Sequence, residues 1–386
     1  MGKDKKVKTY SNSIFYAFFL LVMVLILIVF VVLHFVTSGK AGEGYYELGG
    51  AVDGLTAPFI GISAAVLTFL AFRMQIDANN QVKEQFKLQQ FESQFYELLR
   101  LHKENVNEMV IQGYVFEGVN KTERDISGRK IFVSNINEIN SLINIICNYR
   151  LHYLSKGQNL LDQHQDIIML AYVIFFYGLD SIEKQCKRFK YPVDKRDMSS
   201  SEQDDLIALI CFIREFRFNH FEKGKKKLAK SKIGVSTSNV ELNFNYKPYS
   251  GHLSRYGHYY RNLFLIVKHV VDNKLGLTYE EERNYLRILR AQLTSHEQFL
   301  LFLNWYCEIG SQWEEDDKKG NKFFTDYRMI HNINVDTVVE NSYIDWEKII
   351  RIEFKNRLDF KYLNERDKEL FEVIKGFKSS QDKETK

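Results

Sequence analysis

Two apolar runs without a single Asp, Glu, Lys or Arg lie near the start of the chain and constrain its fold more than any other feature. As helices, residues 14–36 would reach roughly 34 Å and residues 54–72 about 28 Å. The hydrocarbon core of a bilayer is about 30 Å thick, so each run is long enough to cross it. We therefore predict a transmembrane hairpin, with helices over 13–36 and 54–72 joined by a short external loop over 37–53.

The charged residues that flank the two runs indicate the orientation of this hairpin. Four lysines lie in the basic tail over 1–12, and Arg73 and Lys83 follow the second run, whereas the loop between the runs carries more acidic than basic residues. Because lysine and arginine gather on the cytoplasmic side, both termini are predicted to be cytoplasmic. A cleaved signal peptide is the alternative. The first run is about twice as long as the apolar part of such a peptide and is not closed by a small-residue cleavage site.

The rest of the sequence favours helices. The whole chain contains only three prolines, so long uninterrupted helices are permitted almost everywhere. Apolar residues recur at helical spacing in most of it, and we predict an all-α fold with at most a minor β element. The predicted regions are a helical stalk over 73–112, a cytoplasmic helical region over 113–249, a C-terminal helical region over 250–375 and a disordered tail over 376–386.

Local signals fix several element boundaries. Thr278 with Glu281, and Thr294 with Glu297, have the spacing of capping boxes and predict two helix starts. Apolar and polar residues alternate over 239–247, which predicts a short strand or extended arm. Further helices are predicted over 133–153, 163–187, 202–221, 323–330, 345–354 and 364–374.

A cluster of lysines occupies a predicted loop over 223–232. Most such clusters are solvated, and binding of phosphates or anionic lipid headgroups is the alternative. A net charge of +4 is too small by itself to indicate a nucleic-acid-binding protein. The basic patch consists of Lys223, Lys225, Lys226, Lys227 and Lys230.

No sequence feature predicts a metal site or a cofactor. The four cysteines form no CxxC pair, and no histidine has a second histidine or cysteine at ligand spacing. Phosphate-binding glycine loops and the common hydrolase motifs are also absent from the sequence.

Several short motifs resemble those of a known family, the putative phage abortive infection proteins of bacteria, sometimes called AbiC-like. The resemblance runs from the predicted hairpin to about Asn332. One departure is His296, where the relatives usually have a tyrosine-like residue. The motifs are Phe91-Glu92, Phe95-Tyr96-Glu97-Leu98-Leu99, Leu101-His102, Gly128-Arg129, Gly257-His258-Tyr259-Tyr260-Arg261-Asn262-Leu263-Phe264 and Arg290-Ala291-Gln292-Leu293 with Glu297 and Asn304.

This resemblance implies an antiphage role in which infection is aborted, often by killing or arresting the host cell. It implies no mechanism at the level of residues. With the hairpin, it leads us to expect a two-pass protein of the bacterial inner membrane with cytoplasmic termini. The lipid bilayer is then one partner. A phage protein or a nucleic acid is a second candidate, and a second copy of the chain, in a homo-oligomer, is a third.

Arg290 and His296 are the candidate catalytic residues. Their spacing resembles the R-x4-6-H signature of HEPN ribonucleases, in which the arginine would stabilise charge on the scissile phosphate and the histidine would move a proton. On one continuous helix the two would point apart, but the helix start predicted at Thr294 allows them to converge. The alternative is structural, since Arg290 would end one helix and His296 would begin the next.

A polar cleft is the second candidate site, formed by Arg261, Asn262, Glu297 and Asn304. These residues could equally satisfy each other and nearby helix ends within a polar layer. The leading hypothesis is a membrane-anchored defence protein that senses a phage or host component and triggers growth arrest or membrane damage. A membrane-tethered HEPN-like ribonuclease and a non-catalytic scaffold that recruits a soluble partner are the alternatives.

Overall fold

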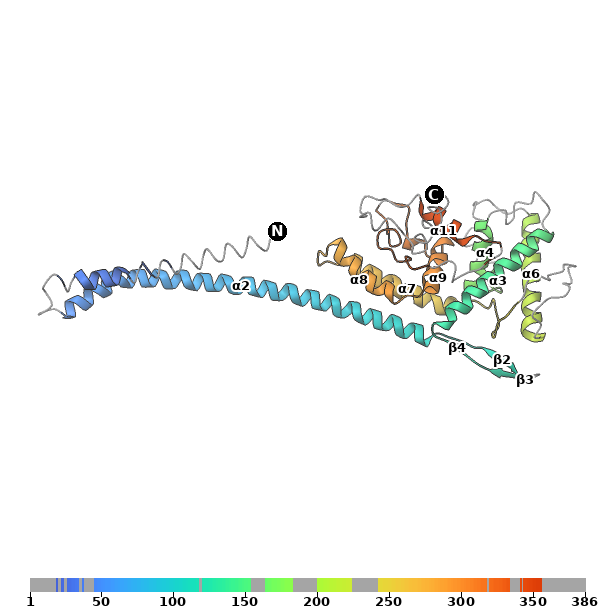
Figure 1. The fold of residues 1–386 in the computed structure, drawn as a ribbon, viewed down its shortest axis with the longest axis horizontal. Helices are drawn as coiled ribbons and strands as arrows, with labels where there is room; N and C mark the ends of the chain where they lie inside the picture. The colour runs from blue at the N-terminus through green and yellow to red at the C-terminus, as the bar shows by residue number, and fades with distance from the viewer. Residues whose placement is uncertain are drawn as a thin grey trace, which may run out of the picture. The chain divides into compact units, whose positions relative to one another are not determined.

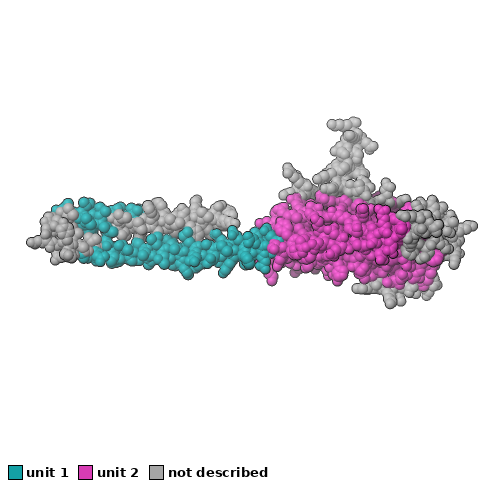
Figure 2. All heavy atoms as spheres, turned by 90° about the horizontal axis from the view of Figure 1, so that it is seen from below, with its two compact units in different colours: residues 1–92 teal, residues 93–386 magenta. Residues whose placement is uncertain are grey.

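The computed structural model is dominated by helices, which confirms the predicted all-α class (Figure 1). Two compact units divide the chain, residues 1–92 and 93–386, and Figure 2 colours them separately. The structure describes residues 45–117, 120–153, 164–182, 200–223, 242–317, 319–333, 341 and 343–355, together with single positions and short stretches between 19 and 37.

The longest element is α2 (Tyr45–Glu108), a helix of 64 residues. It contains the second apolar run and continues through most of the predicted stalk. Its start lies inside the range 37–53 that we predicted as an external loop, which corrects that boundary. Two glycines, Gly49 and Gly50, favoured a loop there, but each costs only about 1 kcal/mol in a helix, and extending an existing helix offsets such a cost.

One helix among the described residues is long and apolar enough to cross a membrane, judged by length and composition. This helix is the Thr56–Glu108 part of α2, with a mean hydropathy of 1.7 over its most apolar window and none of that window buried. The predicted span over 13–36 falls largely outside the described residues, although residues 26–34 are helical. The predicted membrane helix over 13–36 is therefore not confirmed, and neither is the hairpin that it would form with residues 54–72.

The second unit is built around α4, whose residues from Asp166 to Phe176 are all buried. A helix that is apolar on every side is stable only when other helices surround it, and α4 contacts α3, α7 and α9. The continuous helix predicted over 163–187 is interrupted, because α4 ends at Tyr177 and Gly178 adopts a φ of +88°, while residues 183–187 lie outside the described residues. The described helices of this unit are α3 (Lys130–Tyr153), α4 (His164–Tyr177), α6 (Ser200–Lys223), α7 (Leu253–Val271), α8 (Tyr279–Ala291), α9 (Ser295–Tyr306), the short 3-10 helix η1 (Ser311–Trp313) and α11 (Trp346–Lys355).

Both predicted capping boxes are confirmed. The Thr278 hydroxyl accepts a hydrogen bond from the amide of Glu281, whose carboxylate accepts one from the amide of Thr278, and α8 begins there. Thr294 and Glu297 make the same reciprocal pair at the start of α9. The helices predicted over 133–153, 202–221 and 345–354 correspond to α3, α6 and α11, whereas 364–374 lies outside the described residues.

Residues 323–330, predicted as a helix, form turns instead. The carboxylate of Glu314, only 3% exposed, accepts hydrogen bonds from the amides of Phe324 and Thr325, at 3.0 and 3.1 Å. It also accepts one from the Thr325 hydroxyl at 2.6 Å. These bonds would also be possible in the first turn of a helix, but Arg328 adopts a φ of +59°, which no residue inside an α-helix can have, so the segment does not continue as one.

Short β-strands follow α2, and most of them lie inside the range 113–249 that we predicted as a helical region. β1 pairs antiparallel with β4, and β2 pairs antiparallel with β3, so that the chain forms two small ladders. Polar residues are frequent in this segment, and its sequence shows no clear alternation of apolar and polar residues that would have predicted the strands. The strands are β1 (Val110–Ile111), β2 (Tyr114–Glu117), β3 (Asn120–Glu123) and β4 (Ile126–Ser127), with Val110 opposite Ser127 and Tyr114 opposite Glu123.

The alternating segment predicted over 239–247 is an extended arm in its described part, from Leu242 onwards. Leu242, Phe244 and Tyr246 are buried while the residues between them are exposed. In the described part of the arm, an isolated bridge between Tyr246 and Gly113 pairs it with the strand region. The alternation of apolar and polar residues therefore arises because one side of the arm is buried.

A buried polar network ties this arm to the helices through Glu138 of α3. Its side chain is fully buried. One oxygen, Oε2, accepts a hydrogen bond from the Tyr246 hydroxyl at 2.7 Å and lies 3.1 Å from Nε2 of His252. The other, Oε1, accepts one from the amide of Tyr249 at 2.6 Å. A single carboxylate thus joins α3, the extended arm and the residue that precedes α7.

Two backbone segments also cross closely at Gly178 and Gly251. The amide of His252 donates a hydrogen bond to the carbonyl of Phe176 at 3.0 Å. Both glycines have positive φ, +88° and +92°. A Cβ on Gly178 would lie 2.7 Å from the carbonyl oxygen of Ser250, so the crossing leaves no room for a side chain.

Candidate functional site

A cavity of about 580 Å³ lies within the second unit, between the C-terminal part of α2 and the α8–α9 junction. Such a volume is typical of small-molecule sites, which run from roughly 300 to 1,000 Å³. The cavity is lined by Tyr96, Leu99, Arg100, His102, Lys103, Val106, Asn107, Arg129, Ile288, Gln292 and Glu297.

Helical spacing explains the α2 wall of this cavity. Tyr96, Leu99, Lys103 and Val106 follow each other at intervals of three or four residues, so they share one face of the helix. Opposite, the capping box that begins α9 fixes the position of Glu297. The second wall therefore depends on a local sequence signal.

Glu297 is a buried carboxylate, only 1% exposed. Its Oε2 atom accepts hydrogen bonds from the amide and the hydroxyl of Thr294, both at 2.7 Å, and lies 4.0 Å from Nε of Arg129. Burial raises the pKa of the Glu297 carboxyl above its ordinary value, while the Thr294 hydrogen bonds and the Arg129 charge act in the opposite direction. Tyr259 contacts the other oxygen, Oε1, at 3.5 Å.

His102 is the most unusual residue of the cavity wall. It is 3% exposed, and neither of its ring nitrogens has a hydrogen-bond partner among the residues that the structure describes. Its ring packs against that of Tyr259, with centroids 5.1 Å apart. Burial, helped by the nearby charge of Arg129, lowers the pKa of His102 to about 4. A buried polar group normally finds a partner, so His102 marks a place where one is missing.

Basic side chains surround the cavity. Arg129 donates a hydrogen bond from Nη2 to the carbonyl of Gln292 at 2.7 Å, which leaves other guanidinium N–H groups available. Lys103 is exposed and makes no hydrogen bond or ion pair with any described residue. Arg100 differs from both, because its guanidinium is already held by Glu97 and Glu104.

The pKa of His102 predicts a dependence of stability on pH. In the unfolded chain this imidazole takes up a proton near pH 6.5, whereas in the folded chain it stays neutral until about pH 4. Folding is therefore expected to lose stability as the pH falls from 6.5 towards 4, by up to about 3 kcal/mol from this residue. The free energy of unfolding of His102→Gln, measured by urea titration at pH 7 and pH 4.5, should change less between the two than that of the wild type.

Comparison with the wild type at each pH cancels the contributions of other titrating groups, Glu297 included. The matched control is His258→Gln, because His258 is exposed on α7. This control should keep the full pH dependence. An equal dependence in His102→Gln and the wild type would contradict the assignment.

The structure does not join the two candidate catalytic residues. Arg290, in the last turn of α8, donates a hydrogen bond from Nη1 to the carbonyl of Arg328 at 3.2 Å. The side chain of His296, in the first turn of α9, makes no hydrogen bond or ion pair with any described residue, and burial lowers its pKa. Neither residue lines the large cavity.

The residues of the predicted polar cleft differ in their exposure and in their hydrogen-bond partners. Arg261 is exposed and donates to the carbonyl of Gly257 at 2.8 Å, within its own helix. Asn304 is buried and hydrogen-bonds the Tyr172 hydroxyl in the core. Asn262 is half-buried, with an amide oxygen that has no partner among the described residues. Of the four, only Glu297 lines the cavity.

The basic patch lies outside the described residues except for Lys223, which ends α6. No group of three or more histidine, cysteine, aspartate or glutamate residues that could hold a metal ion occurs in the described part of the chain.

Sequence reasoning did not single out His102, Lys103 or Arg129 as site residues. A signal was nevertheless present, because His102 and Arg129 belong to the motifs that carry the family resemblance. Gln292 and Glu297 belong to them as well, and all four residues line the same cavity. The convergence of separate motifs on one cavity is the observation that could have identified it.

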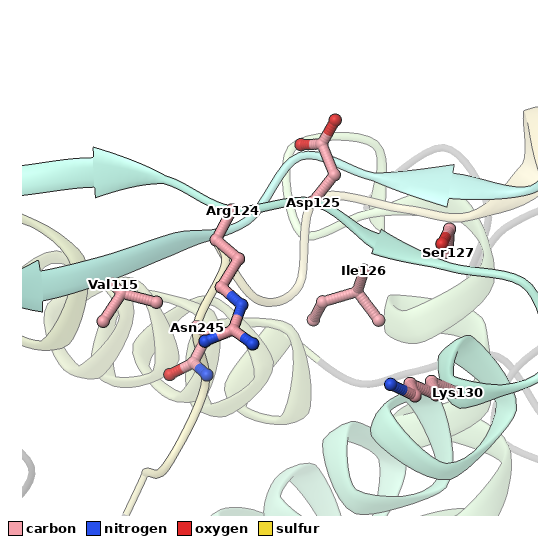
Figure 3. A pocket seen from close by; sticks show the side chains of 7 residues that line it. All are labelled: Val115, Arg124, Asp125, Ile126, Ser127, Lys130 and Asn245. Carbon is pink, nitrogen blue, oxygen red and sulfur yellow. The ribbon is translucent and has the colours of Figure 1, made fainter.

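A second, smaller cavity of about 230 Å³ lies beside the strands (Figure 3). The Arg124 side chain extends towards Asn245, whereas the Asp125 carboxylate points away from it. None of the lining residues carries a buried polar atom without a partner, so this cavity is the weaker candidate. Its lining residues are Val115, Arg124, Asp125, Ile126, Ser127, Lys130 and Asn245.

Comparison with known proteins supports the resemblance over part of its range. The model of one family, described as "Putative phage abortive infection protein", matches residues 251–338. These residues contain α7, α8 and α9, whereas α2 and Arg129 lie outside them. No curated protein and no solved structure matches the chain. The match suggests a role in phage abortive infection.

Proposed function

We propose that this chain is an abortive infection protein anchored in the bacterial inner membrane. In this proposal, the unit formed by residues 93–386 lies in the cytoplasm, recognises a phage or host component at the cavity of His102, Arg129 and Glu297, and then triggers growth arrest or membrane damage. The observation that carries it is the family match over residues 251–338, which include the α8–α9 wall of that cavity.

Two properties of the chain support the membrane anchor. The apolar part of α2 leaves large side chains exposed in a row, including Phe59, Ile62, Phe69 and Phe72. Monomeric soluble proteins rarely leave such an extended apolar surface open to water, whereas lipid covers it without cost. The uncharged run over 14–36 supplies a partner span, which gives the two-pass topology with both termini in the cytoplasm.

Phage plating tests the proposal. Bacteria that express the full chain should show fewer plaques than bacteria with an empty vector, and the protein should resist alkaline extraction from the membrane. Ile62→Arg places a charge near the middle of the second span, at a cost of about 3 kcal/mol. We expect it to lower the membrane-inserted fraction and to reduce protection about tenfold or more.

Val82→Arg is the matched control, because Val82 lies on the same helix beyond the apolar run. Ile62 is 58% exposed and Val82 is 61% exposed, so neither substitution disturbs packing. Equal loss in both variants would contradict a membrane role for residues 54–72. Unchanged plating by the wild type against a broad set of phages would contradict the defence role itself.

A further inference from the structure

We propose that the large cavity binds a free nucleotide, with the base against His102 and the apolar α2 wall and the phosphate at Lys103 and Arg129. This inference rests on the proposed function in one respect: it names the class of ligand that the cavity would recognise during phage defence. Binding itself is a property of the described residues.

The lining offers one surface for a flat ring. Tyr96, Leu99, Val106 and Ile288 supply apolar area, and the side chains of Tyr96 and Ile288 are 53% and 39% exposed. Stacking of a base on an aromatic side chain contributes about 1–3 kcal/mol and is available to every base, because each has a π-face. Lining of this kind, mostly apolar with a few polar groups, is what small-molecule sites show.

His102 supplies a hydrogen-bonding group with no other use. As a neutral imidazole it carries one donor and one acceptor, and both lack partners among the described residues. Leaving a buried polar group without a partner costs about 1–3 kcal/mol. The edge of a nucleobase presents donors and acceptors side by side, so it offers the kinds of partner that the two nitrogens lack, although each nitrogen is itself buried in the cavity wall.

Lys103 and Arg129 supply the site for an anion. Lys103 makes no ion pair with a described residue, and Arg129 approaches Glu297 only to 4.0 Å. The remaining guanidinium donors of Arg129 match the oxygens of a phosphate. Glu297, whose Oε2 atom lies 4.0 Å from Nε of Arg129, offsets part of this attraction whenever its carboxyl is ionised.

Other anions fit this lining less well. Inorganic phosphate would leave the apolar wall and the nitrogens of His102 without contacts. A nucleic-acid strand is held by a track of several cations, whereas this cavity offers Lys103, which pairs with no described carboxylate, and Arg129, which is shared with Glu297. A small molecule that joins a ring to a phosphate uses every feature of the lining.

Equilibrium dialysis of the full chain in detergent tests the proposal. The probes are labelled ATP, GTP, CTP and UTP, with inorganic phosphate and a short single-stranded RNA as comparisons. At least one nucleotide should bind with a Kd of about 1 mM or tighter, and phosphate alone should bind at least tenfold more weakly. His102→Phe keeps a ring of similar shape, removes both nitrogens, and should weaken binding about tenfold.

Lys103→Gln should also weaken binding, and since Lys103 is exposed this variant tests the site even if His102→Phe fails to fold. The control is Lys87→Gln, on the same helix but outside the lining, which should bind as the wild type does. The proposal is overturned if no nucleotide binds, if both cavity variants bind normally, or if the RNA binds more tightly than every nucleotide. Absent binding with intact phage protection would refute the nucleotide alone, whereas binding without protection would refute the defence role.

Discussion

Alanine in place of Gly251 is expected to lower the free energy of unfolding by about 3 kcal/mol or more. A non-glycine residue at positive φ costs roughly 1–2 kcal/mol. In addition, the new Cβ would lie 2.8 Å from the carbonyl carbon of Tyr177 and 2.9 Å from the amide nitrogen of Gly178. Both are backbone atoms at the segment crossing, so neither can move aside as a flexible side chain would.

Gly257→Ala provides a control of opposite sign. Gly257 lies inside α7, and the nearest atom to its Cβ position is Cδ1 of Leu253 at 3.7 Å, an ordinary contact. Alanine there should raise stability by about 0.5–1 kcal/mol. The chain's three tryptophans, Trp305, Trp313 and Trp346, are all buried in the second unit, so urea unfolding followed by tryptophan fluorescence reports on it. Similar effects from the two substitutions would contradict the close crossing.

Glu138→Ala should be about as damaging, with an expected loss of about 3–5 kcal/mol. Removal of the carboxylate leaves the Tyr249 amide without its buried acceptor and removes the partner of His252 Nε2. The Tyr246 hydroxyl loses its 2.7 Å bond and keeps a longer one, at 3.2 Å, to the carbonyl of Ser134. The measurement is again urea unfolding followed by tryptophan fluorescence.

The control for this substitution is Glu280→Ala. Glu280 is exposed in the first turn of α8 and makes no side-chain hydrogen bond among the described residues. Its loss removes only a favourable interaction with the helix dipole, which is worth under about 1 kcal/mol. A Glu138→Ala protein as stable as Glu280→Ala would show that the network is not needed for stability.

The sequence predicted best what depends on neighbouring residues. The two capping boxes lie within four residues each, and they located the starts of α8 and α9. The uncharged run over 54–72, which we predicted as a membrane span, lies in a helix that is long and apolar enough to cross a membrane. Where a helix prediction was wrong, the backbone adopts a positive φ that apolar periodicity does not reveal, at Gly178 after α4 and at Arg328 within residues 323–330.

The cavity could not be predicted in this way, because its walls come from segments far apart in the chain. His102 follows the period of a long helix and has no local feature that marks it as a functional residue. What distinguishes it is burial without a partner, which depends on Tyr259 and Arg129. The R-x5-H spacing of Arg290 and His296 is a local pattern, and no hydrogen bond joins the two side chains in the structure.

The crossing at Gly178 and Gly251 has a practical consequence for anyone who trims this protein. The family match begins at residue 251, which invites excision of residues 251–338 as an independent module. That cut would remove the hydrogen bond between His252 and Phe176 and the contact between Tyr260 and Tyr172. A hydrophobic surface of the fragment that is buried in the full chain would then be exposed to water. We expect a recombinant fragment of residues 251–338 to aggregate. Truncated forms of the protein should therefore retain α3 and α4.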